Sequence, residues 1–194
     1  MSKAEQTKAF IIEKTAPIFN KKGFEGTSMS DITTATGLTK GSIYGNFVNK
    51  DEVALAVFDY NLQKVETIIR SEMAKYETAK DKLMVYVNVY DNFLHHPFPE
   101  GGCPIMNTAT DCDDTHPALK KKAASAINNW KNKIIQLIEK GITDKEFSKT
   151  ADAEKTALSM IATIEGAIMI TKLTGKTTYR NAILETVKEM INNL

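Results

Sequence analysis

The sequence has 194 residues, of which 42% are hydrophobic and 25% are charged. A chain of this length and apolar content can bury a core and is too hydrophobic to belong to the intrinsically disordered proteins. Its 25 lysine and arginine residues nearly balance 24 acidic residues, and the net charge of +1 excludes a histone-like polycation and does not suggest a membrane-surface protein.

The positive charge is concentrated at the start of the chain. Residues 1–50 carry seven lysines and four acidic residues, whereas residues 51–194 carry 18 basic and 20 acidic groups. This asymmetry favours two regions with different roles. Two cysteines and no secretory leader predict a reduced, cytoplasmic location. The longest mostly apolar stretch, 157–170, is too short to predict a membrane-spanning helix.

The first predicted helix ends at Gly23. Its apolar stripe has the three- and four-residue spacing of an amphipathic helix: Ala9, Ile12, Ala16 and Phe19. Pro17 lies inside this stripe, and proline removes a backbone hydrogen bond, so we expect a bend or a break there. Gly23 follows two lysines, which suit the last turn of a helix.

Residues 26–50 predict two short helices joined by a tight turn. Thr27, Ser28 or Ser30 can cap the first, and Gly37 suits its left-handed exit. Thr39 then caps a second helix of about two turns. Together with the preceding helix, this pair is typical of a helix-turn-helix, a unit that places its second helix in the major groove of DNA.

Helical periodicity continues to the end of the chain. We expect a long helix from Lys50 to about Tyr76, capped by Asn49, and further helices over 83–94, near Met106, and over 117–141, 152–173 and 178–194. Strand alternation is nearly absent. The sequence therefore predicts an all-α protein with about nine helices.

The residues of the second short helix suit contacts with DNA. Lys40 can donate to a guanine edge or a phosphate, and Thr39 and Ser42 offer hydroxyl groups. Tyr44 and Lys50 suit phosphate contacts. The alternative is that this helix pair belongs to a bundle without a nucleic-acid role, in which Tyr44 and Phe47 are only core residues; spacing and composition leave both open.

The first 55 residues resemble the DNA-binding signature of the TetR/AcrR family of transcriptional regulators. The resemblance rests on these matching positions: Gly23-Phe24, Thr27-Ser28-Met29, Asp31-Ile32, Thr36 to Tyr44, Phe47 and Lys50-Asp51-Glu52. The rest of the chain is similar to family members in helix number and length, in Gly102 to Ile105 and in the pair Glu165-Gly166. The resemblance implies a homodimeric repressor with three DNA-binding helices and a larger C-terminal domain for ligand binding and dimerisation.

The family's contact positions map onto a set of residues that we expect to bind DNA: Thr27, Ser28, Thr39, Lys40, Gly41, Ser42, Tyr44, Asn46 and Lys50. Two departures from the family pattern are visible. Asn46 stands where the family often has histidine or tyrosine, and Pro17 interrupts a helix that is usually unbroken. We expect the DNA-binding domain over residues 1–50 and the ligand-binding and dimerisation domain over residues 51–194.

The last two predicted helices have more apolar residues than one face can hide, and the resemblance implies a four-helix bundle across a dimer. We expect a second stripe and the last helix to meet the partner: Met160, Ile164, Ala167, Thr171, Ile183, Val187 and Met190.

We expect a small-molecule effector to bind among apolar and aromatic residues of the central helices: Phe58, Leu62, Tyr86, Tyr90, Phe93, Met106, Trp130, Ile134, Ile161, Glu165 and Met169. Many such residues are ordinary core. Glu165 is a carboxylate in an otherwise apolar helix, so it needs a cationic ligand, a partner such as Tyr90 or Trp130, or solvent.

No cofactor, metal or catalytic site is expected. Cys103, Cys112 and His116 lack the tight cysteine pairs of structural zinc sites. None of the common hydrolase, protease or nucleotide-binding motifs is present, so an enzyme is not predicted.

The sequence thus predicts a ligand-responsive, sequence-specific DNA-binding regulator, most simply a homodimeric repressor that a small molecule releases from its double-stranded operator. Two alternatives remain. The first is a helical protein that binds a hydrophobic ligand and has no DNA role. The second, which the resemblance suggests, is a regulator that senses redox state through the Cys103 thiol.

Overall fold

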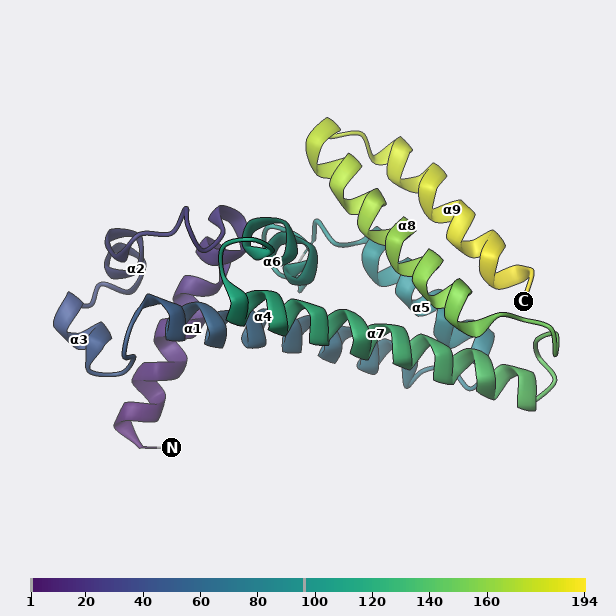
Figure 1. Ribbon diagram of the computed structural model, residues 1–194, viewed down its shortest axis with the longest axis horizontal. Helices are drawn as coiled ribbons and strands as arrows, with labels where there is room; N and C mark the ends of the chain where they lie inside the picture. The colour runs from purple at the N-terminus through teal and green to yellow at the C-terminus, as the bar shows by residue number, and fades with distance from the viewer. Residues whose placement is uncertain (1, 96) are drawn as a thin grey trace. The chain divides into compact units, whose positions relative to one another are not determined.

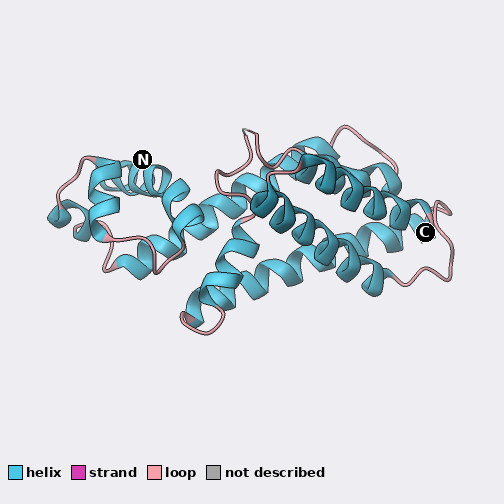
Figure 2. Cartoon of the chain, turned by 90° about the horizontal axis from the view of Figure 1, so that it is seen from above, coloured by secondary structure: helices cyan, strands magenta, loops and turns pink. Residues whose placement is uncertain are grey.

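The computed structural model describes residues 2–95 and 97–194, and in this part of the chain helices are joined by loops, without a strand (Figures 1 and 2). Its nine helices are α1 (Lys3–Lys22), α2 (Met29–Thr36), α3 (Lys40–Tyr44), α4 (Lys50–Met73), α5 (Ala79–Asp91), α6 (Pro104–Cys112), α7 (Pro117–Thr143), α8 (Ala153–Thr174) and α9 (Thr177–Asn192). The all-α prediction is confirmed.

Short polar side chains fix where several helices begin. Thr39 accepts a hydrogen bond from the Ser42 amide at the start of α3, and Asn49 does the same for the Glu52 amide at the start of α4. Gly37 ends α2 with φ 68° and ψ 9°, a left-handed conformation that glycine adopts without steric cost. These three predictions from the sequence are confirmed.

Helix α1 corrects the expected break and part of the expected apolar stripe. It runs without a break through Pro17. Its buried face agrees with the predicted stripe at Ala16 and Phe19, whereas Ala9 is exposed and the other buried positions are Ile11 and Thr15. The Thr15 hydroxyl is accommodated by donating to the Ile11 carbonyl at 2.7 Å.

The chain forms two compact units. The first comprises Met1–Val65 with His96–Ala124, and the second comprises Glu66–His95 with Ser125–Leu194. The expected boundary at residue 50 does not coincide with this division, because the start of α4, α6 and the start of α7 all belong to the first unit. Both α4 and α7 therefore contribute residues to each unit.

In the first unit, α1 packs against α2 and α6, and α2 packs against α3. The apolar side chains between these helices are completely or almost completely buried: Ile11, Phe19, Ile32, Ile43 and Phe47. The helix-turn-helix therefore has its own core. The two short helices are held by burial rather than by their length, which is too small for stable isolated helices.

In the second unit, α8 packs against α9, and α5 packs against both of them. Within the described part of the chain, α8 alone is long and apolar enough to cross a bilayer if only its length and composition are considered. Seven of its residues are buried, among them Ala157, Ile161 and Ile168, and a core helix of a globular unit has this same property.

Candidate nucleic-acid interface

Helix α3 has one buried side and one exposed side. Ile43 is 0% exposed and Phe47 is 1% exposed, so both belong to the core. Tyr44 is 42% exposed, and Thr39 and Lys40 are also exposed. The structure therefore decides one question that the sequence left open: Phe47 is a core residue and Tyr44 is not.

The exposed side of α3 is small and polar. The Lys40 ammonium lies 5.8 Å from the centre of the Tyr44 ring, so the cation and the phenol lie on the same side of the helix. A Cβ added at Gly41 would meet nothing closer than the Thr39 hydroxyl oxygen at 3.9 Å. Open space at Gly41 lets another molecule approach the backbone closely.

Lys50 has a more specific environment than the sequence indicated. Its ammonium donates to the Phe24 carbonyl at 2.9 Å and lies 4.0 Å from the centre of the Phe24 ring. The residue is half-buried. It therefore ties the first turn of α4 to the turn that precedes α2, and an ammonium group retains two further N–H donors in this arrangement.

Thr27, Ser28 and Asn46 close local turns. The Thr27 hydroxyl donates to the Gly23 carbonyl at 2.6 Å and the residue is 0% exposed, so its predicted DNA contact is not available in this conformation. The Asn46 amide donates to the Ser42 carbonyl at 2.9 Å. Ser28 is exposed and caps α2 through the Asp31 amide.

Asp31 stays ionised beside the start of α2. Hydrogen bonds from Lys22, and from the backbone and hydroxyl of Ser28, hold the pKa of Asp31 far below its ordinary value of 3.8. A negative charge at this end of the helix is favourable, because the helix dipole is positive there.

One exposed residue beside α3 was not predicted. Val48 is 82% exposed, although it follows the buried Phe47 directly. Its amide donates to Glu52, which also accepts from Lys8; these two bonds lower the pKa of the Glu52 carboxyl. The sequence could have indicated this exposure, because Val48 stands between a core residue, Phe47, and the cap of α4, Asn49.

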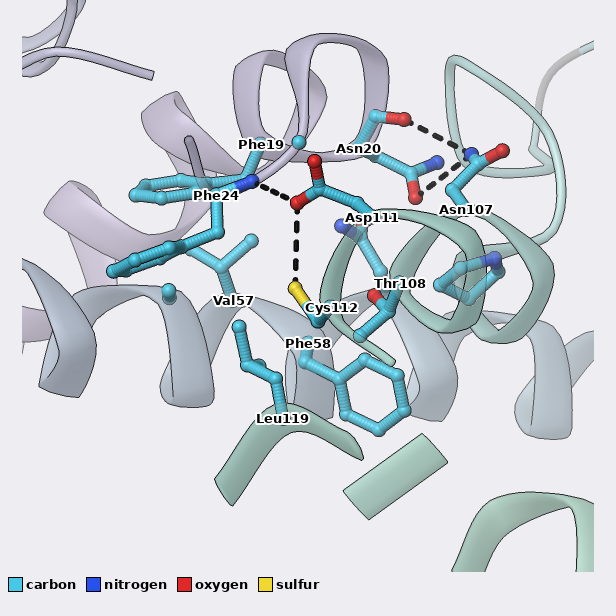
Figure 3. Close-up of a pocket in the computed structure, with 14 residues that line it drawn as sticks. Phe19, Asn20, Phe24, Val57, Phe58, Asn107, Thr108, Asp111, Cys112 and Leu119 are labelled. Atoms are coloured by element: carbon cyan, nitrogen blue, oxygen red, sulfur yellow. Dashed lines mark hydrogen bonds between the residues drawn. The ribbon is translucent and has the colours of Figure 1, made fainter. Parts of the chain in front are cut away.

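The turn between α1 and α2 is bound to α6 by polar contacts (Figure 3). The Phe24 amide donates to the Asp111 carboxylate at 2.6 Å, and the Cys112 thiol donates to the same oxygen at 3.3 Å. The Asn107 amide donates to the Asn20 carbonyl at 2.9 Å. These contacts join segments 87 residues apart and fix the position of the turn that leads into α2.

These residues surround a cavity of about 20 Å³, which is room for a single water molecule. It is therefore not an effector pocket.

The residues predicted to bind an effector are divided between the two units. Phe58, Leu62 and Met106 lie in the first unit and the others in the second. In the second unit, Trp130 of α7 stacks on Tyr90 of α5, with ring centres 5.1 Å apart, and Tyr86 lies 6.0 Å from the same indole.

Most of the remaining predicted effector residues are enclosed. Phe93, Ile134 and Ile161 are also buried, and Glu165 is half-buried. Met169 is 48% exposed on the outer side of α8, so its assignment to an internal pocket was wrong.

The predicted dimer stripe is largely internal. Five of its seven residues are buried within one chain: Met160, Ile164, Ala167, Thr171 and Val187. The packing of α8 against α9 covers them, so they cannot meet a partner in this conformation. The exposed apolar residues of α8 lie on a different side of the helix: Leu158, Ala162, Met169 and Leu173. Leu173 is 80% exposed.

Cys103 and Cys112 are both free thiols and both buried. Burial, together with the hydrogen bond to Asp111, raises the pKa of Cys112 to about 12, so this thiol is unreactive at neutral pH. Cys103 is 0% exposed, and oxidation there would require the surrounding structure to open. Over residues 2–95 and 97–194, no three metal-ligating side chains gather at one point.

Two family models match the chain. Residues 11–57 match the model described as bacterial regulatory proteins of the tetR family, and residues 79–187 match the tetracyclin repressor-like C-terminal domain.

Similar structures and a similar sequence agree with these matches. A TetR-family regulator from Cytophaga hutchinsonii with a crystal structure is 45% identical in sequence to this chain. The two structures have a TM-score of 0.94 over 100% of this chain and 97% of that one. A TetR regulator from Chloroflexus aurantiacus is 35% identical, with the same TM-score over 99% and 97% of the two chains. The transcriptional regulator TtgR of Pseudomonas putida is 24% identical over 85% of this chain and 80% of its own.

Proposed function

The chain belongs to the TetR family of bacterial transcriptional regulators, and we propose that it is a homodimeric repressor that a small molecule releases from its operator. As a member of this family it is a helix-turn-helix DNA-binding regulator and not an enzyme. Because such a regulator acts on the chromosome, we place it in the cytoplasm.

The exposed side of α3 carries this proposal. A five-residue helix with a buried inner side presents Thr39, Lys40 and Tyr44 outward from a unit with its own core. Such a helix fits the major groove, where lysine reads guanine and hydroxyl groups reach base edges or phosphates. Two copies would enter successive major grooves about 34 Å apart, or a multiple of this, at a near-palindromic operator.

Each predicted contact has a role in this interface. We assign Lys40 to a base edge, Thr39 and Ser42 to bases or phosphates, and Tyr44 to a phosphate. Gly41 allows the backbone to approach the DNA. Outside α3, we assign Ser28, Asn46 and Lys50 to the phosphate backbone, which positions the reading helix without selecting sequence. Thr27 is left out because its side chain is enclosed.

The effector would act from the second unit. Helices α4 and α7 each contribute residues to both units. A bound ligand that displaces either helix would therefore alter how the DNA-binding helices α2 and α3 are held. A coupling free energy of roughly 1–3 kcal/mol would weaken operator binding about 5- to 150-fold.

The dimer would use the exposed apolar side of α8. Leu158, Met169 and Leu173 leave an apolar surface on this helix that a second copy can cover. A two-fold axis would bring the same side of each α8 together, as in most soluble homodimers.

The proposal is tested by selecting the preferred operator from random duplex DNA and comparing the wild type with Lys40→Ala. We expect a near-palindromic sequence for the wild type and a relaxed base preference for the variant, because a lysine contact to a base edge discriminates between bases. Uniform weakening on all sequences would assign Lys40 to a phosphate instead.

A wild-type protein that shifts no duplex at low salt would contradict the proposed operator binding. That result would support the alternative of a hydrophobic-ligand carrier without a DNA role.

A further inference from the structure

Trp130 carries a buried polar atom whose hydrogen-bonding capacity is unused. The residue is 6% exposed, and its indole Nε1 has no hydrogen-bond partner among the described residues. An indole N–H can only donate, so it needs an acceptor. Most buried polar groups in folded proteins are paired, and an unpaired one requires an explanation.

The rings around Trp130 define the shape of what can lie beside it. Tyr90 is stacked on the indole, with ring centres 5.1 Å apart and planes 17° apart, and Tyr86 lies 6.0 Å away with a tilt of 35°. Both tyrosines are 2% exposed. All three rings belong to the second unit, on α5 and α7.

The hydrogen-bond geometry of the indole restricts the ligand further. An acceptor must approach Nε1 close to the plane of the indole, because the N–H bond lies in that plane. A flat molecule that continues this plane would lie almost parallel to the Tyr90 ring. It could therefore accept from Trp130 and stack against a tyrosine at the same time.

The charges near this cluster disfavour an anionic ligand. Burial and the negative charge of Glu66 raise the pKa of Tyr86, so this tyrosine stays neutral and lies in a negative field. Glu66 forms an ion pair with Lys133 at 2.7 Å, so this lysine is not available to bind an anionic ligand. A cationic group cannot accept a hydrogen bond, so it would leave the Trp130 N–H unpaired.

We propose that Trp130 is the polar contact of the effector site, and that the effector is a planar, conjugated, uncharged molecule with a carbonyl-type acceptor. This inference rests on the proposed function, because it identifies the chemical class of the small molecule that releases the repressor. The Trp130 indole donates to the ligand carbonyl, and the conjugated body of the ligand lies against the Tyr90 ring.

The test compares ligands that differ only in the acceptor. Two planar ketones, 1-indanone and 9-fluorenone, are each paired with the hydrocarbon that lacks the carbonyl, indane and fluorene. Trp130 is the single tryptophan of the chain, so ligand binding is followed directly by its fluorescence. Calorimetry then gives dissociation constants for the wild type and for Trp130→Phe, which keeps a ring but removes the N–H group.

We expect at least one ketone to quench Trp130 saturably and to bind about tenfold more tightly than its hydrocarbon, as one neutral hydrogen bond allows. In Trp130→Phe this preference should disappear, while the hydrocarbon binds as before. Tyr76→Phe is the matched control, because Tyr76 is 40% exposed and should leave the preference unchanged. Circular dichroism checks that both variants are folded.

Three results would overturn the inference: no saturable binding of either ketone, equal affinity for ketone and hydrocarbon, or a preference that persists in Trp130→Phe. DNA binding of the same preparations is measured separately. A protein that binds its operator but no ketone refutes the ligand class alone. A protein that binds ketones but no DNA refutes the proposed regulatory function and leaves the site intact.

Discussion

Lys50 makes an internal contact in addition to its proposed contact with DNA, and a sequence motif cannot separate the two. Its ammonium already binds the Phe24 carbonyl and lies above the Phe24 ring, which orients the side chain at the start of α4. An exposed lysine loses side-chain entropy when it binds a phosphate, and a lysine held in this way has lost part of it beforehand. We therefore interpret the contact with Phe24 as preorganisation for DNA binding rather than as a replacement for it.

Replacing Lys50 with alanine should weaken binding to DNA of every sequence. The plot of log affinity against log salt concentration should become shallower by about 0.9, because one phosphate contact is lost. Titrations at several salt concentrations measure this slope. Lys75→Ala, which removes an exposed lysine paired with Glu72 in the second unit, is the control and should leave the slope unchanged.

An unchanged slope in Lys50→Ala, combined with lower affinity and lower stability, would contradict a phosphate contact. Lys50 would then act only through Phe24, by holding the turn before α2 in place.

At the scale of the helix, α2 depends on its first turn. It has only eight residues, so its stability comes from its cap and its packing rather than from its length. Ser28 and Asp31 bond each other's backbone amides, and Lys22 at the end of α1 binds the same carboxylate at 2.6 Å. The cap therefore also connects α2 to the preceding helix.

Asp31→Asn should lower the stability of the protein in a pH-dependent way. The folded state lowers the pKa of Asp31, so the ionised group stabilises the fold at pH values above its ordinary pKa of 3.8. This stabilisation is lost as the pH falls below 3.8 towards the pKa of the folded state. Urea unfolding should show a lower midpoint than wild type at pH 7, and the difference should shrink at acidic pH.

Asp114→Asn serves as the control, because Asp114 is exposed and, among residues 2–95 and 97–194, takes part in no ion pair or helix cap. A difference between Asp31→Asn and the wild type that stays constant from pH 7 to pH 3 would contradict the role assigned to the carboxylate.

The sequence predicted the helices well because their ends depend on neighbouring residues. Thr39 and Asn49 cap helices through amides three positions later, and Gly37 adopts its conformation without distant help. The enclosure of Thr27 was missed although it is local, because a threonine beside a helix start can bond either the preceding turn or a phosphate.

Long-range contacts could not be predicted in this way. Asp111 meets the Phe24 amide across 87 residues, and periodicity contains no information about that pair. For a related reason, most of the predicted dimer stripe proved to be buried within one chain. Helix α8 has apolar residues both on the side that contains Met160 and on the side that contains Leu173, and only the packing of other helices, α9 and α5 among them, decides which side is buried.

At the scale of the whole molecule, the proposed dimer would determine how tightly DNA is held. One copy offers a single five-residue reading helix, which contacts few base pairs. Two linked copies would bind a palindrome with both reading helices, and the second binding event would become effectively intramolecular. Loss of the dimer should therefore reduce operator affinity far more than loss of any single side chain in α3.

Leu173→Glu tests this expectation. Two-fold symmetry would place two new carboxylates in the proposed apolar interface, where an unpaired charge is costly. Sedimentation should then give the mass of one 21.5 kDa chain, whereas the wild type should give twice that mass. Affinity for a palindromic operator should fall by about 10²-fold or more, while binding to a single half-site stays unchanged.

The control is Tyr76→Glu, which adds a charge at another exposed position of the second unit and should leave the dimer intact. If Leu173→Glu sediments as a dimer with wild-type operator affinity, the exposed side of α8 is not the interface. If both variants become monomers, the interface extends beyond α8. Because Leu173 is 80% exposed in a single chain, the substitution should not disturb the fold, and an unchanged unfolding midpoint would attribute its effect to association alone.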